Sequence, residues 1–186
     1  MNEDITGYIL AGGRSRRMGQ DKRLIRFEGA TLLESVIRLL ETVLASPPVL
    51  VGDNLIGVAP TGYPILPDAQ PDCGPLSGLI SALTHCPTDW ALVIGVDMPY
   101  LSANDLSKLI HAVHEDLDGV SLKAGPGIEP LAAIYAASTH AFWEKRLAMG
   151  KLSLQEGINL LKWGQVSLPQ GSTALMNVNR PEDLLA

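Results

Sequence analysis

Short apolar segments alternate with helix-length segments along most of this 186-residue chain. The clearest apolar segment, Trp90 to Val96, is continuous enough to lie in the middle of a sheet with both of its faces covered. Strands and helices that alternate in this way favour parallel pairing through right-handed crossovers. The sequence therefore predicts an α/β fold of three layers, in which a mostly parallel, Rossmann-like sheet carries helices on both faces.

The ends of the predicted helices carry recognisable signals. Thr31 and Glu34 form a capping box at the start of one helix, and Ser102 and Asp105 have the same pattern at the start of another. Pro75 suits the first turn of a third helix, where its missing N–H does no harm. The predicted helices are 31–45, 74–84, 102–114, 138–149 and 153–162, and the predicted strands are 5–10, 49–51, 65–66, 90–96, 119–122, 131–135 and 166–168. We expect them to form one domain, residues 1–186.

Composition and charge narrow the function classes. The chain is 46% hydrophobic and 18% charged, as expected of an ordinary globular enzyme, and its net charge of −6 argues against a general nucleic-acid surface. Apolar runs fall short of the roughly 20 residues that span a bilayer, and the N-terminus lacks the pattern of a signal peptide. We therefore expect a cytoplasmic protein without a membrane partner. Cys73 and Cys86 lack metal-site spacing and are interpreted as free thiols.

Basic residues crowd into one loop of this acidic chain. They are Arg14, Arg16, Arg17, Lys22, Arg23 and Arg26. The loop follows the first predicted strand, and Gly12 and Gly13 let its backbone approach a ligand closely and present N–H groups to an anion. Arg14, Arg17 and Lys22 can then neutralise phosphate oxygens. The spacing fits neither a Walker A loop nor a dinucleotide fingerprint, so a different kind of phosphate loop is predicted.

A carboxylate follows a second predicted strand. Asp97 comes directly after Val96, and ligands in sheets of this class bind at the carboxyl ends of the strands. A hard oxygen ligand in this place suits Mg²⁺, which typically takes one or two carboxylates together with substrate phosphates. We therefore expect Asp97 to bind a metal ion beside the basic loop.

The motif Leu10-Ala-Gly-Gly-x-Ser-x-Arg-Met-Gly-x-Asp-Lys22 resembles the signature of the molybdenum cofactor guanylyltransferase family (molybdopterin-guanine dinucleotide biosynthesis protein A). More broadly it resembles glycosyltransferase-A-like nucleotidyltransferases. Further motifs continue the resemblance over nearly the whole chain: Pro67-Asp68 with Gly74-Pro-Leu-Ser-Gly78, Val96-Asp-Met-Pro-Tyr100, Glu129-Pro-Leu131 and Met176-Asn-Val-Asn-Arg-Pro-Glu182.

The resemblance implies roles for individual residues. Arg14, Arg17 and Lys22 would act in catalysis, and Asp97 would bind both metal and nucleotide. The remaining nucleotide-binding residues would be Leu10, Ala11, Gly12, Gly13, Lys22, Asn54 and Asp68, and Asn177 and Asn179 would bind the acceptor. Three of these have structural interpretations as well: a plain turn for Asn54, a solvated turn for Asp68, and a helix cap for Asn179.

The activity that the resemblance implies is transfer of GMP from GTP to the terminal phosphate of molybdopterin, with Mg²⁺ as cofactor and pyrophosphate as product. It also implies transient contact with proteins that donate molybdopterin or mature molybdoenzymes. A molybdopterin cytidylyltransferase or a sugar-phosphate nucleotidylyltransferase remains an alternative, since physical reasoning does not identify the base. Asp21-Lys22 and the Asn177-to-Pro181 ending resemble the guanylyltransferases more closely than the cytidylyltransferases. A regulatory module without turnover is disfavoured because Lys22 and Asp97 are both present.

Overall fold

The computed structural model describes residues 4–12, 21–180 and 183–184. Within them, seven strands form one sheet in the order β5-β4-β1-β6-β8-β7-β9. They are β1 (Ile5–Leu10), β4 (Val49–Val51), β5 (Ile65–Leu66), β6 (Trp90–Gly95), β7 (Gly119–Ala124), β8 (Gly127–Ala136) and β9 (Trp163–Ser167). Parallel pairs join β5, β4, β1 and β6, as well as β7 and β9. The predicted mostly parallel sheet is confirmed.

Strand β8 is the exception to parallel pairing. It runs antiparallel to both β6 and β7, which it separates in the sheet. It also begins at Gly127, four residues before the predicted start at Leu131, because Ala124 and Gly127 pair across a tight turn that joins β7 directly to β8. The start of β8 therefore lies at the same edge of the sheet as the end of β6, where the sequence predicts ligands to bind.

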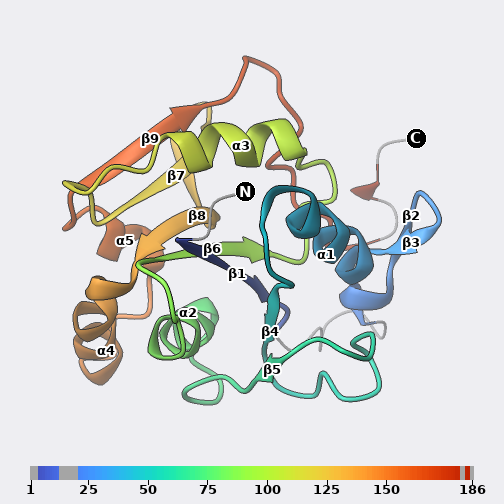
Figure 1. Ribbon diagram of the computed structural model, residues 1–186, viewed down its shortest axis with the longest axis horizontal. Coiled ribbons are helices and arrows are strands. Elements are labelled where there is room, and N and C mark those ends of the chain that lie inside the picture. Colours follow the sequence, from blue (N-terminus) through green and yellow to red (C-terminus); the bar gives the residue numbers. More distant parts are fainter. Residues whose placement is uncertain (1–3, 13–20, 181–182, 185–186) are drawn as a thin grey trace.

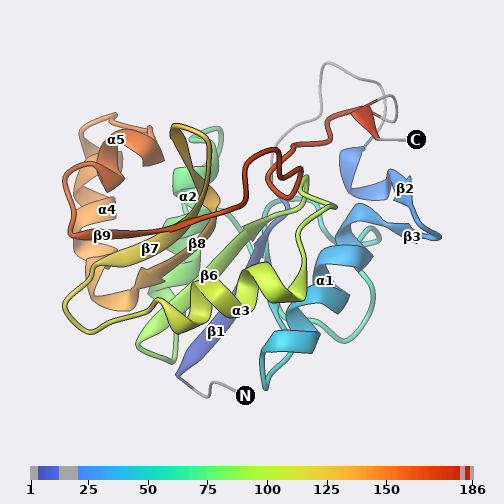
Figure 2. The same ribbon diagram turned by 90° about the horizontal axis from the view of Figure 1, so that it is seen from above.

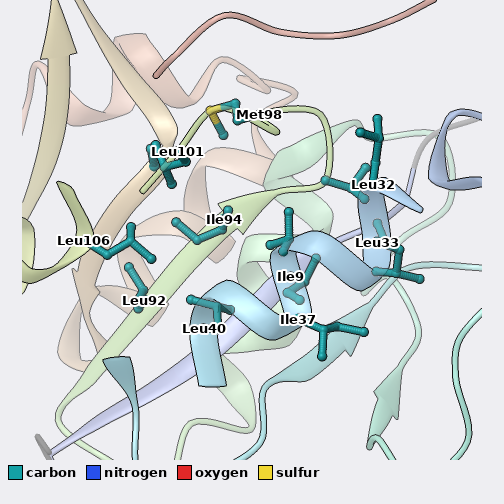
Figure 3. Packing of buried hydrophobic residues seen from close by; sticks show 14 of the residues in the cluster. Ile9, Leu32, Leu33, Ile37, Leu40, Leu92, Ile94, Met98, Leu101 and Leu106 are labelled. Atoms are coloured by element: carbon teal, nitrogen blue, oxygen red, sulfur yellow. The ribbon is translucent and has the colours of Figure 1, made fainter. Parts of the chain in front are cut away.

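Helices cover both faces of the sheet (Figures 1 and 2). On one face lie α1 (Leu32–Val43) and α3 (Ala103–His111), and on the other lie α2 (Pro75–Thr84), α4 (His140–Ala148) and α5 (Leu154–Ile158). Side chains of β1 alternate between the two cores, with Ile9 toward α1 and Tyr8 toward α2. Figure 3 shows the core under α1 and α3, where Ile9, Leu92 and Ile94 of the sheet meet apolar side chains of both helices. The predicted three layers are confirmed.

Both predicted capping boxes are present. Glu34 N–H donates to Thr31 Oγ1 over 3.2 Å, and Thr31 N–H donates to Glu34 Oε2 over 2.7 Å. Ser102 and Asp105 exchange the same two bonds at the start of α3. Helix α2 begins at Pro75, as predicted. These local signals therefore fixed where the three helices start.

The region after α4 differs from the prediction. Helix α5 ends at Ile158 instead of continuing to residue 162, and β9 begins at Trp163 instead of Val166. Asp118 explains the early strand, because its N–H donates to Lys162 O over 2.8 Å and its carboxylate accepts the Lys162 N–H over 2.8 Å. These two bonds bring the chain beside β7 before a longer helix can form.

Four short elements supplement the predicted helices and strands. A 3-10 turn, η1 (Lys22–Leu24), is followed by the two-residue strands β2 (Arg26–Phe27) and β3 (Ala30–Thr31), and η2 (Ala137–Thr139) precedes α4. Cys73 and Cys86 are free, as predicted. No helix in the described part of the chain is long and apolar enough to cross a bilayer.

Candidate functional site

The ends of β1 and β4 form a closely packed edge. Ala11 N–H donates to Val51 O over 2.9 Å, and Gly52 N–H donates to Leu66 O over 2.9 Å. A Cβ atom on Gly52 would lie 2.5 Å from the backbone nitrogen of Gly12, closer than any side chain allows. Glycine at position 52 therefore lets the loops after β1 and β4 touch. Leu10 and Ala11 are buried, so what they can offer a ligand is mainly backbone.

Lys22 and Asp97 meet at this edge, although they are far apart in the sequence. The Lys22 Nζ atom lies 2.8 Å from Asp97 Oδ2, and the side chains are 21% and 16% exposed. Lys22 is placed by η1, and Asp97 follows β6 and the buried Val96. A positive charge is thus accommodated beside this carboxylate, at the carboxyl end of a central strand.

Asp68 lies on the other side of the β1 loop. A Cβ atom on Gly12 would lie 2.9 Å from Asp68 Oδ2, and one on Gly78 of α2 would lie 3.2 Å from Asp68 Oδ1. Burial, together with the charge of Asp53, raises the pKa of the half-buried Asp68 carboxyl, while the Asp53 N–H counteracts this by donating to it. The solvated-turn interpretation of Asp68 is therefore a poor fit.

Helix α2 holds the segment that carries Asp68. The Ser77 hydroxyl accepts the Gln70 N–H over 2.6 Å and donates to Gln70 O over 2.7 Å, and the Ser81 hydroxyl donates to Pro67 O over 2.7 Å. Both serines are buried. The two serines thus fix both ends of the loop around Asp68 against the helix.

The C-terminal segment reaches the same site. Val178 N–H donates to Asp97 O over 2.7 Å, and Asn177 and Asn179 on either side of it are exposed. The Asp183 carboxylate accepts the N–H groups of Asn179 and Arg180. Asp183 therefore supplies a carboxylate to the backbone at Asn179, where the sequence predicts a helix cap.

The other predicted site residues divide into two groups. Asn54 is exposed in a turn with φ of +56°, a conformation that asparagine tolerates well, so the turn interpretation describes its backbone. Gly13, Arg14 and Arg17 lie outside the described residues. Their predicted roles stay predictions.

Sequence reasoning gave no role to Glu129. Antiparallel pairing of Ile94 with Ala132 brings the start of β8, which carries Glu129, to the edge of the sheet where β6 ends before Asp97. Burial and the charge of Asp97 raise the pKa of the Glu129 carboxyl, although the Leu131 N–H donates to it over 3.0 Å. The Glu-Pro-Leu motif was visible in the sequence, but its place beside Asp97 depends on the antiparallel direction of β8.

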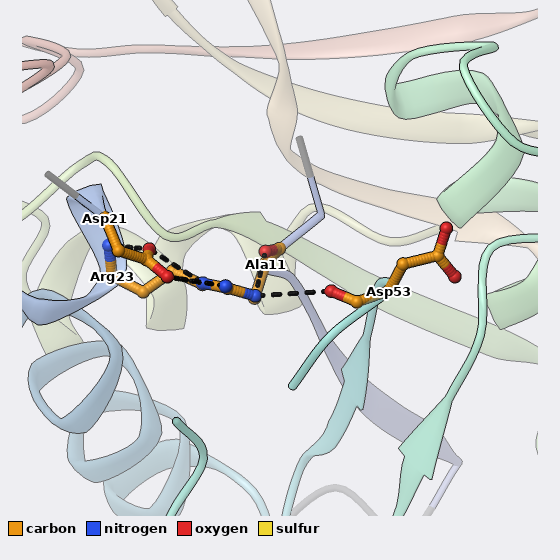
Figure 4. A network of polar contacts seen from close by, with 4 residues as sticks. All are labelled: Ala11, Asp21, Arg23 and Asp53. Atoms are coloured by element: carbon orange, nitrogen blue, oxygen red, sulfur yellow. Dashed lines mark hydrogen bonds and ion pairs between the residues drawn. The ribbon is translucent and has the colours of Figure 1, made fainter. Parts of the chain in front are cut away.

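Arg23 is a second residue that the sequence prediction left without a specific role. Its guanidinium pairs with Asp21 and also reaches the carbonyls of Ala11 and Asp53 over 3.5 and 3.3 Å (Figure 4). Its bonds lower the pKa of the Asp21 carboxyl. The Arg23 guanidinium therefore binds groups of the protein itself.

The donor chemistry of the edge fits a hard divalent cation. No group of three or more His, Cys, Asp or Glu side chains could hold a metal among residues 4–12, 21–180 and 183–184. Asp97 and Glu129 nevertheless offer two carboxylates at one edge. Mg²⁺ typically uses one or two protein carboxylates and completes its coordination with phosphate and water oxygens, so this arrangement suits a metal that arrives with a nucleotide.

Comparisons with known proteins identify the family to which this chain belongs. The family model of the MobA-like NTP transferase domain matches residues 7–159. A protein of Opitutus terrae, named a probable molybdenum cofactor guanylyltransferase, is 35% identical over 96% of this chain and 92% of its own length. The chain belongs to the molybdenum cofactor guanylyltransferase family. The molybdenum cofactor guanylyltransferase of Serratia proteamaculans is 30% identical over all of this chain and 94% of its own length.

A solved structure shows the same fold. The molybdopterin-guanine dinucleotide biosynthesis protein A of Archaeoglobus fulgidus superposes with a TM-score of 0.74, at 22% identity, over 96% of this chain and 94% of its own. At that identity the likeness concerns the fold. It confirms the predicted mostly parallel nucleotidyltransferase sheet with helices on both faces.

Proposed function

We propose that this chain is a nucleotidyltransferase that transfers GMP from GTP to the terminal phosphate of molybdopterin, in the cytoplasm. The family membership supports this activity, because its named members are guanylyltransferases. The observation that carries the proposal for this chain is the convergence on Asp97. Lys22 of the nucleotide loop contacts its carboxylate, and Val178, between the two acceptor-side asparagines, binds its carbonyl.

The reaction forms one P–O bond and breaks another. An oxygen of the molybdopterin phosphate attacks the α-phosphorus of GTP, and the bond from that phosphorus to the oxygen bridging to the β-phosphorus breaks, so that pyrophosphate leaves. A phosphate monoester, whose second pKa is about 6, is largely dianionic near neutral pH and needs no general base. The residues therefore have to align the two phosphates in line and neutralise charge.

The described residues can divide this work. Lys22, released from Asp97 when a nucleotide binds, would neutralise phosphate oxygens as the pyrophosphate departs. Leu10, Ala11 and Gly12 would present their backbone to the nucleotide, and Asp68 would accept N–H groups of the guanine base. Asn177 and Asn179 would bind the acceptor, while Arg14 and Arg17 would assist Lys22. Asp97 would hold Mg²⁺, with Glu129 close by, and the bound ion would supply further neutralisation of phosphate charge.

Product analysis tests this proposal directly. The chain is incubated with molybdopterin, Mg²⁺ and each of GTP, CTP, ATP and UTP, and the dinucleotide and pyrophosphate are quantified by mass spectrometry and an enzymatic assay. We expect one pyrophosphate per molybdopterin guanine dinucleotide, formed from GTP. Formation of the cytosine dinucleotide instead would assign the chain to the cytidylyl branch, and no transfer from any nucleotide would refute the proposal.

A further inference from the structure

Lys22 and Arg23 are neighbours in η1, but they connect to opposite sides of the candidate site. Lys22 reaches Asp97 at the end of β6, and Arg23 reaches the loops that follow β1 and β4. Figure 4 shows the Arg23 side chain extended between Asp21 on one side and the backbone of Ala11 and Asp53 on the other. One 3-10 turn therefore places two cations with different tasks.

Asp21 fixes the start of this connection. Its carboxylate accepts the Arg23 backbone N–H over 3.0 Å, which caps η1, and accepts Arg23 Nε over 2.8 Å. Arg23 Nη2 donates to the second carboxylate oxygen, so the guanidinium is held by a two-pronged, charge-assisted contact. The side chain of Arg23 is only 12% exposed. The direction of the guanidinium is thereby set before it meets the sheet.

Asp53 continues the connection toward Asp68. The Asp53 carbonyl accepts from Arg23 Nη1 over 3.3 Å, and the preceding residue, Gly52, packs against Gly12. The Asp68 carboxylate in turn lies against Gly12. The two contacts of Arg23 Nη1, at 3.3 and 3.5 Å, are long for hydrogen bonds. They therefore orient the loops after β1 and β4 but add little to the stability of the fold.

We propose that Arg23 is a positioning residue that joins the phosphate side of the nucleotide site, at Lys22, to its base side, at Asp53 and Asp68. The role rests on the proposed function, because it concerns the nucleotide that the site binds. Through this connection Arg23 sets both the affinity for the nucleotide and the selectivity for its base. A lysine could not replace it fully, since an ammonium group lacks the planar fork that bridges Asp21 and two carbonyls.

The test compares Arg23→Ala with Arg26→Ala in the full chain. Arg26 belongs to the same basic stretch and is exposed, so it is a control for lost charge. Binding of GTP and CTP is measured by calorimetry, and steady-state kinetics give KM for each substrate. We expect Arg23→Ala to weaken GTP binding about tenfold, to lower the preference for GTP over CTP about fivefold, and to leave kcat and the KM for molybdopterin within about threefold. Arg26→Ala should change GTP binding less than twofold.

Two further variants separate positioning from folding. Arg23→Lys keeps the charge and the stem, so it should fold even if Arg23→Ala does not, and it should weaken GTP binding about threefold. Asp21→Asn retains a capping oxygen but loses the ionic contact. Combined with Arg23→Ala, it should add almost nothing to the single effect, because residues of one network are not additive.

The outcomes distinguish this inference from the proposed function. Wild-type protein that binds GTP selectively, with an Arg23→Ala variant of unchanged affinity and selectivity, would overturn the role of Arg23 alone. An equal loss in Arg26→Ala would overturn it too, since net charge would then explain the effect. Wild-type protein that binds none of the nucleotides would refute the proposed function itself.

Discussion

The carboxylate at the start of α1 and the carboxylates at the carboxyl edge of the sheet lie in environments that shift their pKa values in opposite directions. The Glu34 carboxyl at the start of α1 accepts the Thr31 N–H, and that bond lowers its pKa. At the sheet edge, burial raises the pKa of both Asp68 and Glu129, and a neighbouring carboxylate adds to the shift in each case. The first arrangement stabilises the folded chain, whereas the second destabilises it.

The difference indicates which carboxylates serve a ligand. Buried carboxylates placed beside like charges are uncommon where stability alone is at stake, and they gather at functional sites. A cation or the N–H groups of a base would relieve the repulsion at Asp68 and Glu129, but would do nothing for Glu34. Substitutions in the two regions should therefore have opposite effects on stability and activity.

The largest effect is expected at Lys22 and Asp97. Lys22→Ala and Asp97→Ala should each slow pyrophosphate release by about a hundredfold or more, because a preorganised charge is lost where charge develops in the transition state. Both side chains are partly exposed, so the melting temperature should move by no more than about 2 °C. Lys108→Ala, at an exposed position of α3, is the matched control. Near-normal rates in either site variant would refute the assigned mechanism.

Asp68→Asn should separate stability from binding. We expect GTP affinity to fall about tenfold, because a neutral amide accepts N–H groups less strongly than a carboxylate does. The raised pKa means that the folded chain holds the Asp68 proton more tightly than the unfolded chain, so ionised Asp68 lowers stability at pH 7. The variant should therefore melt at a higher temperature than wild type at pH 7.

The pH dependence checks the sign of this effect. The gain in melting temperature should shrink as the pH falls and disappear below about 4, the usual aspartate pKa, where the wild-type carboxyl is protonated in both the folded and the unfolded state. Melting curves without nucleotide, recorded from about pH 3 to pH 8, measure this change. An Asp68→Asn variant that is less stable than wild type at pH 7 would contradict the contrast between the two regions.

The helix starts should behave in the reverse manner. Thr31→Ala and Ser102→Ala each remove an N-cap, which should lower the free energy of unfolding by about 1 kcal/mol. Denaturant melts measure this change, and kcat for pyrophosphate release should stay within about twofold of wild type. A loss of activity without a loss of stability would show that these caps belong to the site.

The smallest expected effect is at Glu129. Glu129→Gln removes a negative charge near Asp97 and should raise the melting temperature of the ligand-free chain at pH 7 by about 1 to 3 °C. A carboxyl whose pKa is raised by folding destabilises the folded chain only when it is ionised, at a pH above that pKa. The gain in melting temperature of Glu129→Gln should therefore vanish below about pH 4, where Glu129 is protonated. Lower stability at pH 7 would mean that the Leu131 contact outweighs the repulsion.

Much of the fold could be predicted because its signals are local. The capping boxes at Thr31 and Ser102 and the proline at position 75 mark helix starts, and the apolar run of β6 marks a central strand. The end of α5 could not be predicted, since it depends on Asp118 binding a residue 44 positions away. The direction of β8 depends in the same way on pairing between distant residues.

The sequence identifies the candidate site residues that belong to a recognisable motif. It does not identify those whose role depends on contacts with distant parts of the chain. Lys22 and Asp97 follow strand ends and meet as expected of one site. Arg23 belongs to the same basic stretch, but its partners Ala11 and Asp53 come from two other loops, and the sequence alone does not reveal them. Glu129 needed the antiparallel register to be recognised beside Asp97.

Nucleotide-dependent thermal stabilisation tests whether the carboxyl edge around Lys22, Asp68 and Asp97 is a guanine nucleotide site. The melting temperature is measured with Mg²⁺ and GTP, CTP, ATP or UTP, for wild type and for Asp68→Asn. Because a ligand that binds the folded state stabilises it by mass action, GTP should raise the melting temperature of wild type most, and the Asp68→Asn variant should lose that preference. An equal response to all four nucleotides, or a preference for GTP that survives in Asp68→Asn, would show that this edge does not select guanine through Asp68.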